Sequence, residues 1–424
     1  MNTTTADLSR YSLGCGDRFG REGEAQLQAY ADARDLGIEV APVWNKSHRE
    51  HKTVGTGYPS VREEADAAVS ALGWTSPYHV DADHIRIDTV DGYVPYSDFF
   101  TLDVADKIGA PVAGDDEEAF VRDLRRYCGS LAIPGVSTPI EVTEETLRTV
   151  GRRYLAAIAE AGRIYRRIAE QKAGTGFITE VSIDETEEPQ TPEELFFILA
   201  AIAREAIPVQ TIAPKFFGRF NKGVDYVGDL DRFTREFSDD LCVISFAVKE
   251  FGLPEDLKIS VHSGSDKFSL YPIIRKAVQT HGAGLHLKTA GTTWLEEIIG
   301  LAEAGGEGLA IAKEVYRSGV SRFDELCAPY SAVIDIQRET LPSPDEVDGW
   351  SGSEFARTVR HNQSEARYNK QVRQLLHVGY KVAAEMGARY TDALQHYRDI
   401  VARHVHENLL QRHLKPVFGG EDRR

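Results

Sequence analysis

Lys258-Ile259-Ser260-Val261-His262-Ser263-Gly264-Ser265-Asp266-Lys267 is the stretch of sequence that indicates the fold. Its first half is a short segment with apolar residues at Ile259 and Val261, as in a buried strand, and its second half is a turn of small and polar residues. The same order recurs along the chain and predicts eight strands. They are Tyr11–Gly14, Glu39–Trp44, Tyr78–Ala82, Phe99–Val104, Phe177–Ile183, Val209–Ala213, Lys258–His262 and Gly284–Thr289.

Helical patterns lie between most of these strands. Pro192, for example, stands where a helix over Glu193–Glu205 would begin. Eight strands that alternate with helices predict an α/β fold, a closed (β/α)8 TIM-type barrel, with a doubly wound open sheet as the alternative. The other expected helices are Glu22–Leu36, Val61–Leu72, Phe268–His281 and Trp294–Ala304.

Two long regions do not fit the simple alternation. Residues 107–172 contain the acidic run Asp115–Glu118 and a helical pattern over Glu144–Lys172, which we interpret as a helical insertion. Residues 330–424 are helical in pattern, with long amphipathic stretches over Phe355–Met386 and Asp392–His413. We expect this C-terminal helical extension to pack on the barrel, so that residues 1–424 form one domain.

Charge and cysteine content limit the classes of partner. The chain has 424 residues, 49 lysines and arginines, 66 aspartates and glutamates, and a formal net charge of −17. Such a balance repels nucleic acid and anionic membranes, and no apolar run is long enough to span a bilayer. The four cysteines are far apart, as in reduced thiols. These features predict a cytoplasmic protein that acts on a small molecule. They leave open whether the chain forms a homo-oligomer.

The predicted strands end in polar residues, and in a barrel this is the end that carries the chemistry. Two of these ends, Val80-Asp81-Ala82-Asp83-His84 and Val261-His262-Ser263-Gly264-Ser265-Asp266, resemble the strand ends of class II, zinc-dependent aldolases. In those enzymes an Asp-His pair supplies a proton-transfer carboxylate and a metal ligand, and a later His supplies another ligand.

A catalytic zinc site uses about three protein ligands and keeps one position open. We predict His84, His262 and His286 as ligands, with Glu180 as the alternative third ligand. Zn is the favoured divalent cation, and Mn, Ni and Co are the alternatives. For each histidine the competing interpretation is a hydrogen-bonded structural residue. For Asp83 the alternatives are proton transfer and orientation of a neighbouring ligand.

Several basic residues follow the predicted strands of this acidic protein, which predicts a pocket for a carboxylate. The predicted substrate-binding residues are Arg18, Lys46, Asp184, Lys215, Ser265, Asp266, Lys267 and Lys288.

The segment Gly14–Gly20 has the spacing GxGxxxG rather than the GxGxxG of dinucleotide-binding loops. Asp17 would also lie where the pyrophosphate arrives. Together with the lack of a GxxxxGK[ST] loop, this argues against nicotinamide and nucleotide triphosphate chemistry.

The chain as a whole resembles the tagaturonate epimerase family. The resemblance rests on seven ordered segments and on a C-terminal helix, Gln374–Tyr380. The segments are Tyr11–Gly20, Pro42–Ser47, Val80–His84, Glu180–Glu185, Ala213–Phe216, Val261–Phe268 and His286–Thr289. The resemblance implies interconversion of tagaturonate and fructuronate, and some relatives are expected to act on fructose and tagatose as well.

The two keto-uronates differ at C4, whose C–H bond is β to the ketone and is not acidic. Simple enolisation therefore cannot invert C4. Retro-aldol cleavage of C3–C4, rotation of the aldehyde and re-addition can do so, with a metal that carries the enediolate charge. Asp83 and Glu180 are the predicted acid/base pair. A class II aldolase, a sugar-acid isomerase and a non-catalytic sugar-binding barrel are the rival hypotheses.

Overall fold

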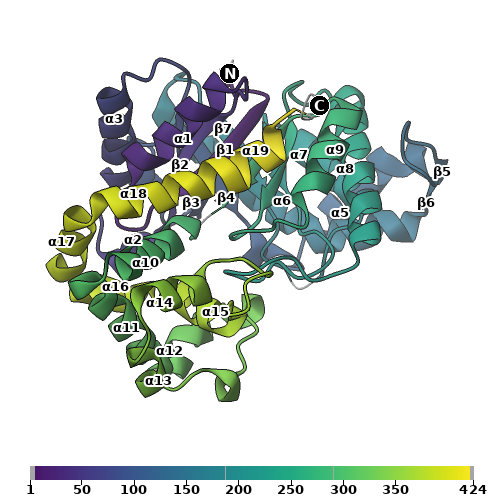
Figure 1. The fold of residues 1–424 in the computed structure, drawn as a ribbon. Helices are drawn as coiled ribbons and strands as arrows, with labels where there is room; N and C mark the ends of the chain where they lie inside the picture. The colour runs from purple at the N-terminus through teal and green to yellow at the C-terminus, as the bar shows by residue number, and fades with distance from the viewer. Residues whose placement is uncertain (1–4, 187, 290, 421–424) are drawn as a thin grey trace.

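The computed structural model describes residues 5–186, 188–289 and 291–420. Its centre is a closed barrel of eight parallel strands in the order β1-β10-β9-β8-β7-β4-β3-β2 (Figure 1). All eight predicted strands are therefore confirmed, and the open-sheet alternative is wrong. The strands are β1 (Tyr11–Gly16), β2 (Ala41–Ser47), β3 (His79–Ile85), β4 (Phe99–Asp103), β7 (Ile178–Ser182), β8 (Thr211–Ala213), β9 (Lys258–His262) and β10 (Leu285–Lys288).

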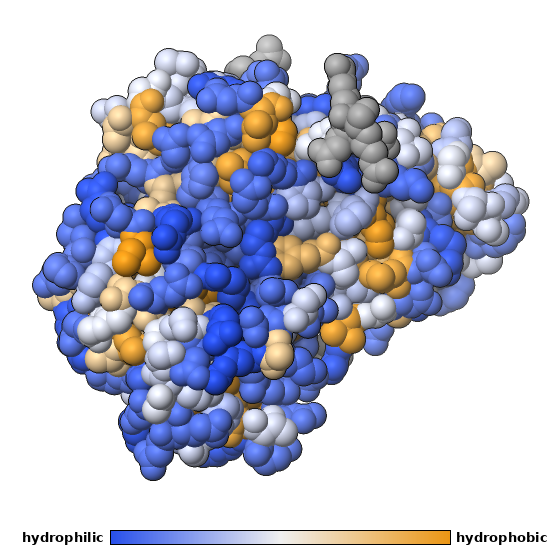
Figure 2. Space-filling model, in the orientation of Figure 1, coloured by the Kyte–Doolittle hydropathy of each residue, from blue (hydrophilic) through white to orange (hydrophobic). Residues whose placement is uncertain are grey.

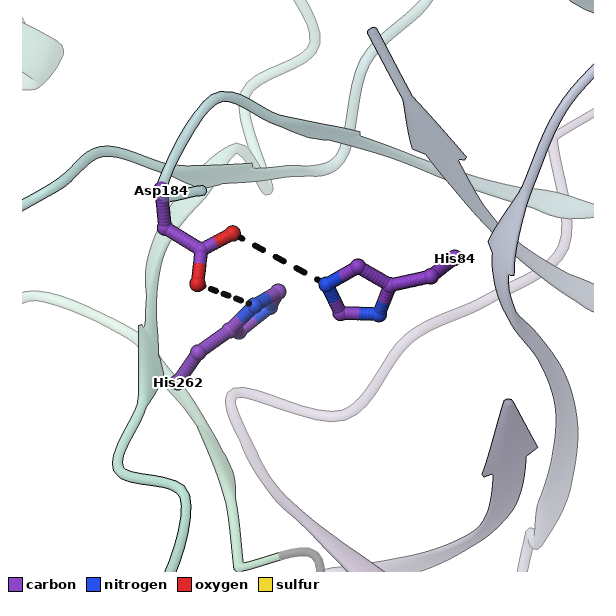
Figure 3. A group of neighbouring side chains, drawn as sticks. All are labelled: His84, Asp184 and His262. Carbon is purple, nitrogen blue, oxygen red and sulfur yellow. Dashed lines mark ion pairs between the residues drawn. The ribbon is translucent and has the colours of Figure 1, made fainter. Parts of the chain in front are cut away.

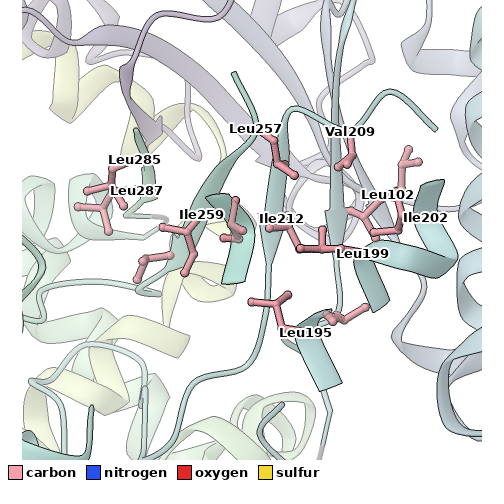
Figure 4. Packing of buried hydrophobic residues seen from close by; sticks show 14 of the residues in the cluster. Leu102, Leu195, Leu199, Ile202, Val209, Ile212, Leu257, Ile259, Leu285 and Leu287 are labelled. Carbon is pink, nitrogen blue, oxygen red and sulfur yellow. The ribbon is translucent and has the colours of Figure 1, made fainter. Parts of the chain in front are cut away.

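Most residues of these strands are buried, because helices cover the outside of the barrel and side chains fill its inside. On the outer face of the barrel, Leu199 of α7 (Pro192–Arg204) packs with Ile212 and Ile259 in the main core (Figure 4). Inside, Val43, Phe99 and Ile178 form an apolar layer that Leu8 closes. The barrel is thus a packed core whose polar residues gather above this layer.

The expected helices between the strands are present, with ends shifted by a few residues at most. Thr191 accepts a hydrogen bond from the backbone N–H of Glu194, and Pro192 stands in the first turn, so the predicted start of α7 is confirmed. The other expected helices are α1 (Gly23–Asp35), α3 (Ser60–Leu72), α9 (Tyr271–His281) and α10 (Thr292–Ala304). Three helices were not expected from the sequence: α2 (His48–Val54), α4 (Val90–Tyr93) and α8 (Leu230–Phe251).

The region 107–172 is only in part an insertion. Its helix α6 (Glu144–Lys172) packs against β4 and α7, and so serves as the barrel helix that follows β4. The added part is α5 (Gly114–Leu124) with an antiparallel pair, β5 (Gly129–Leu131) and β6 (Ile140–Val142). This pair lies at the periphery in Figure 1, far from the ends of the barrel strands that carry the polar residues.

The C-terminal region is a second layer of helices on one side of the barrel (Figure 1). Most of its apolar side chains form a separate core with Trp294 and Ile298 of α10, whereas those of residues 409–417 join the main core of the barrel. The helix predicted over Phe355–Met386 is wrong as a single element, because residues 360–369 and Gly379 interrupt it, whereas the stretch Asp392–His413 is helical except at Tyr397. The helices are α11 (Gly306–Ser321), α12 (Phe323–Cys327), α13 (Pro344–Asp348), α14 (Gly352–Val359), α15 (Lys370–Val378), α16 (Tyr380–Met386), α17 (Ala388–His396), α18 (Arg398–Glu407) and α19 (Lys415–Phe418).

The face in Figure 2 is dominated by hydrophilic side chains, with small and separate hydrophobic patches. Within the described ranges, no helix has both the length and the apolar character needed to cross a membrane.

Candidate active site

A cavity of about 1380 Å³ opens at the carboxyl ends of the barrel strands. The C-terminal region reaches it as well, because Tyr330 and Val333 belong to its wall. Charged and histidine side chains from most of the strand ends line it. They include Asp83, Asp103, Asp184, Glu185, His48, His84, His262, Arg18, Arg49, Arg86, Lys215, Lys222 and Lys288.

Three of these side chains form a group that could hold a metal ion. One ligand atom each from His84, Asp184 and His262 lies within 4.8 Å of the other two (Figure 3). The His262 Nδ1 atom is 3.2 Å from Asp184 Oδ2, and the His84 Nε2 atom is 3.9 Å from Asp184 Oδ1. Two imidazoles and one carboxylate are a common ligand set for a catalytic zinc ion.

A second carboxylate holds the far nitrogen of each ring. His84 Nδ1 is 2.8 Å from Asp83 Oδ1, and His262 Nε2 is 2.8 Å from Glu180 Oε1. Such contacts fix the orientation and tautomer of metal-binding histidines, so that the other nitrogen points at the metal. The donor atoms and their supports therefore fit a divalent cation.

The local charge has the sign that such a cation needs. Burial would lower the pKa of the His262 ring, but Asp184 and Glu180 outweigh it and raise the pKa to about 9. Burial would raise the pKa of the Asp184 carboxyl, but His262 and His84 hold it well below its usual range. The group thus keeps its carboxylates ionised in a negative field, and this field attracts a proton or a metal ion to the rings.

The backbone of β3 turns His84 toward this group. Asp81 and Asp83 both point into the barrel, so regular alternation would turn His84 outward. However, the pairing of β3 with β4 shifts register between Ala82 and Ile85, and His84 has a φ of 52°. A bulge and a left-handed backbone at a non-glycine residue re-aim a side chain at some cost in strain.

His286, predicted as the third ligand, does not belong to the group, and Asp184 stands in its place. The His286 side chain is fully buried, with Nδ1 2.9 Å from Ser12 Oγ and its ring centroid 5.1 Å from that of Phe99. In the barrel register it lies beside Ser12 and Ser260, whereas Lys288 lies beside His262. His286 is therefore one layer too deep, and burial lowers its pKa to about 3.

Lys288 and Glu180 form part of a buried ionic cluster. The Lys288 Nζ atom is 2.8 Å from Asp81 Oδ2 and from Glu180 Oε1, and 3.0 Å from Asp83 Oδ1. Three carboxylates already surround this ammonium group, so it is not free to bind a substrate carboxylate. The substrate-binding role predicted for Lys288 from the sequence is therefore not supported. Glu180 is fully buried behind His262 and does not line the cavity, which contradicts its predicted acid/base role.

Four predicted substrate residues do not line the cavity. Lys46 lies between Asn45 and Ser47, which do, and alternation turns it outward toward the helix layer, where its charge acts on Glu64 of α3. The other three, Ser265, Asp266 and Lys267, are fully buried in the turn after β9.

Arg18, Asp184 and Lys215, which the sequence predicts to bind substrate, line the cavity. The Arg18 Nε atom is 2.8 Å from Glu50 Oε1, and its guanidinium lies 3.9 Å from the ring centroid of Tyr380.

Arg49, Lys222 and Glu185 also line the cavity, and none of them was predicted from the sequence as a site residue. Glu185 directly follows Asp184, and Arg49 is two residues beyond β2, so closeness to a strand end could have indicated both. Lys222 lies well beyond β8, in a loop that carries no periodic signal.

The Gly14–Gly20 segment binds its own side chain rather than a pyrophosphate. The Asp17 carboxylate accepts hydrogen bonds from the backbone N–H groups of Phe19, Gly20, Arg21 and Glu22, at 2.6–2.9 Å. It thus occupies the amides that a dinucleotide phosphate would need, which agrees with the sequence argument.

These features define a (β/α)8-barrel enzyme with a histidine–carboxylate group in the wall of a cavity at the carboxyl ends of the strands. The family model of tagaturonate epimerase matches residues 1–416, and the chain belongs to that family, which makes it an isomerase.

Individual relatives agree with this assignment. The chain is 29% identical over 422 residues to the tagaturonate/fructuronate epimerase of Thermotoga maritima, a match that covers 95% of this chain and 81% of the relative. The native crystal structure of fructuronate-tagaturonate epimerase from Cohnella laeviribosi superposes with a TM-score of 0.76 at 24% identity, over 96% of this chain and 83% of that one. A glycerol complex of the same enzyme gives the same TM-score and identity. At this identity the structural likeness shows the shared fold.

Proposed function

We propose that this chain interconverts tagaturonate and fructuronate by inversion at C4. The observation that carries the proposal is the group of His84, Asp184 and His262 in the wall of a cavity large enough for a hexose derivative. Family membership supports an epimerase, and the group supplies the type of site that C4 inversion requires. Retro-aldol cleavage, rotation and re-addition invert C4 without removing its non-acidic C–H proton.

His84, Asp184 and His262 would hold a divalent cation, for which we propose zinc, with manganese, nickel and cobalt as alternatives. When bound, such a cation polarises the C2 ketone and stabilises the enediolate charge of the cleaved sugar. Asp83 and Glu180 keep the two rings in the orientation that ligation requires. We therefore assign Glu180 a positioning role.

The C4 hydroxyl must lose a proton during cleavage and regain one during re-addition. Asp83 lines the cavity next to His84 and remains our proposal for one of the proton-transfer groups. For the second we propose Glu185 in place of Glu180. Its carboxylate is exposed to the cavity and near enough for its charge to act on His84, and no ion pair or hydrogen bond engages it among the described residues.

The test is proton NMR of the purified, zinc-reconstituted enzyme with fructuronate, with and without a chelator. We expect tagaturonate to appear, and the chelator to stop its formation. Release of free three-carbon fragments instead would identify an aldolase. Solvent deuterium in C1 or C3 without inversion at C4 would identify an isomerase acting between C1 and C2.

A matched pair of variants tests the role of Glu185. We expect Glu185→Gln to retain the metal and lose most turnover. Glu188→Gln, an exposed neighbour that does not line the cavity, should behave as the wild type. Normal turnover in Glu185→Gln would refute the assignment.

A further inference from the structure

Arg49 and Lys222 line the cavity, and their charged groups have no ion-pair or hydrogen-bonding partner anywhere in residues 5–186, 188–289 and 291–420; the exposed Lys52 is a third cavity cation of this kind. The other strand-end cations are engaged. Lys288 contacts three carboxylates, Arg18 contacts Glu50, and Arg86 contacts Asp103 at 2.9 Å. An unpaired cation on a cavity wall retains its capacity to bind an anion.

The loop that carries Lys222 is held rigidly by buried residues. Lys267 Nζ donates to the carbonyl oxygens of Asn221 and Val224, at 3.0 and 2.8 Å. Ser265 Oγ accepts from the backbone N–H of Gly223 at 2.9 Å. Two residues predicted from the sequence to bind substrate therefore hold the loop that presents Lys222.

The C-terminal helices hold the same loop from the other side. Arg373 of α15 donates to the carbonyl oxygen of Gly223 at 2.6 Å and pairs with the buried Asp266 at 2.8 Å. Gln374 donates to the carbonyl oxygen of Lys222 itself, at 3.1 Å. Five side-chain contacts fix a four-residue segment whose only charged side chain faces the cavity. Such preorganisation lowers the entropic cost of binding.

Arg49 approaches from a different element, α2. Its guanidinium lies 4.8 Å from the ring centroid of Tyr330, which belongs to the C-terminal region. Its charge acts on Lys222, so the two cations are close enough to repel each other. The charges of Glu185 and Glu50 act on both cations, but neither acid forms an ion pair with Arg49 or Lys222 within 4.0 Å, and Glu50 pairs with Arg18. Two neighbouring cations that form no ion pair with an anion of the protein can together bind the anionic group of a ligand.

We propose that Arg49 and Lys222 together bind the carboxylate of a ketohexuronate and so make the enzyme prefer sugar acids over neutral ketoses. The inference rests on the proposed function, whose substrates carry that carboxylate at C6. The metal group would take the C2 end of the sugar, and the two cations would take the C6 end. Lys46, Lys267 and Lys288, for which the sequence suggested this role, are turned away or already engaged.

The test is calorimetric binding of fructuronate, fructose and fructose 6-phosphate to the full-length, zinc-loaded enzyme, together with kcat and KM for fructuronate and fructose. In Arg49→Gln and in Lys222→Gln we expect fructuronate to bind about 10- to 100-fold more weakly, the range for one charge-assisted hydrogen bond. Fructose binding should not change. Arg49→Lys and Lys222→Arg, which keep the charge, should recover part of the affinity.

Arg219→Gln is the matched control, because Arg219 lies at the same cavity but pairs with Asp335 at 3.5 Å. It should keep the wild-type preference for fructuronate. Unchanged fructuronate affinity in both glutamine variants would overturn the inference, as would an equal loss for fructose. Tighter binding of fructose 6-phosphate than of fructuronate to the wild type would overturn the assignment to a carboxylate. If the wild type binds fructuronate through the two cations but turns over neither sugar, the inference stands and the proposed function fails.

Discussion

The variant Glu180→Gln tests whether Glu180 positions a metal ligand or transfers a proton. The Glu180 carboxylate lies 2.8 Å from His262 Nε2 and 2.8 Å from Lys288 Nζ, and it is buried behind the cavity wall. The glutamine keeps the shape of the side chain but loses the negative charge that orients the ring. Loss of such an outer partner typically weakens metal binding about 10- to 100-fold, or about 1.4–2.8 kcal/mol.

The assay is competition of the zinc-loaded protein against a chromophoric chelator, followed by turnover at saturating zinc. We expect weaker zinc binding and a kcat that largely recovers at saturation, because Glu180 does not reach the cavity. His286→Asn is the control, since His286 is equally buried but lies outside the metal group, and it should keep wild-type affinity. Normal zinc affinity combined with lost turnover in Glu180→Gln would refute the reasoning and restore the acid/base role.

Three further predictions concern ligation, stability and pH. Asp184→Asn should lower zinc affinity more than Glu180→Gln does, because it removes a ligand rather than its support; the same competition assay measures both, and equal affinities would contradict the ligand set. Arg373→Met should lower the free energy of unfolding by about 3–5 kcal/mol, because it leaves Asp266 buried without its main partner. The exposed control Arg338→Met should cost less than about 1 kcal/mol, and denaturant titration that finds similar values would refute this difference. Burial, with the charge of Asp17, raises the pKa of Glu22 to about 8, so the folded state favours the neutral carboxyl. The resulting stabilisation is complete below the unfolded pKa of about 4.3 and is lost as the pH rises to about 8, so Glu22→Gln should gain stability relative to wild type over that window. A gain that does not change with pH would argue against this titration.

The strands could be read from the sequence because both faces of a parallel barrel strand are buried. In Phe99–Asp103, for example, Phe99 faces the inside of the barrel and Phe100 and Leu102 face the helices, so apolar residues occupy both faces. The helices of the C-terminal region were harder to delimit. There the helical periodicity continues from Phe355 to Met386, although residues 360–369 and Gly379 interrupt the helix.

The site was predictable in its location but only partly in its residues. His84 and His262 could be identified because each stands at a strand end beside small or acidic residues. The choice between His286 and Asp184 depended on the depth of each side chain inside the barrel, which follows from the register between strands. Lys46 was misassigned because one step of alternation separates the inside of the barrel from the helix layer. Lys222 could not be found, because only tertiary contacts bring its loop to the cavity.

The loop that presents Lys222 has a consequence for protein engineering. The groups proposed for the chemistry stand on the barrel strands and directly after them, whereas Lys222 stands on a separate segment that the C-terminal helices brace. The Lys222 part of the proposed carboxylate site is thus encoded apart from the groups proposed for cleavage, whereas its Arg49 part follows strand β2 directly. A library confined to residues 219–224, with α15 left intact, could therefore redirect the enzyme toward uncharged sugars without disturbing the reacting centre.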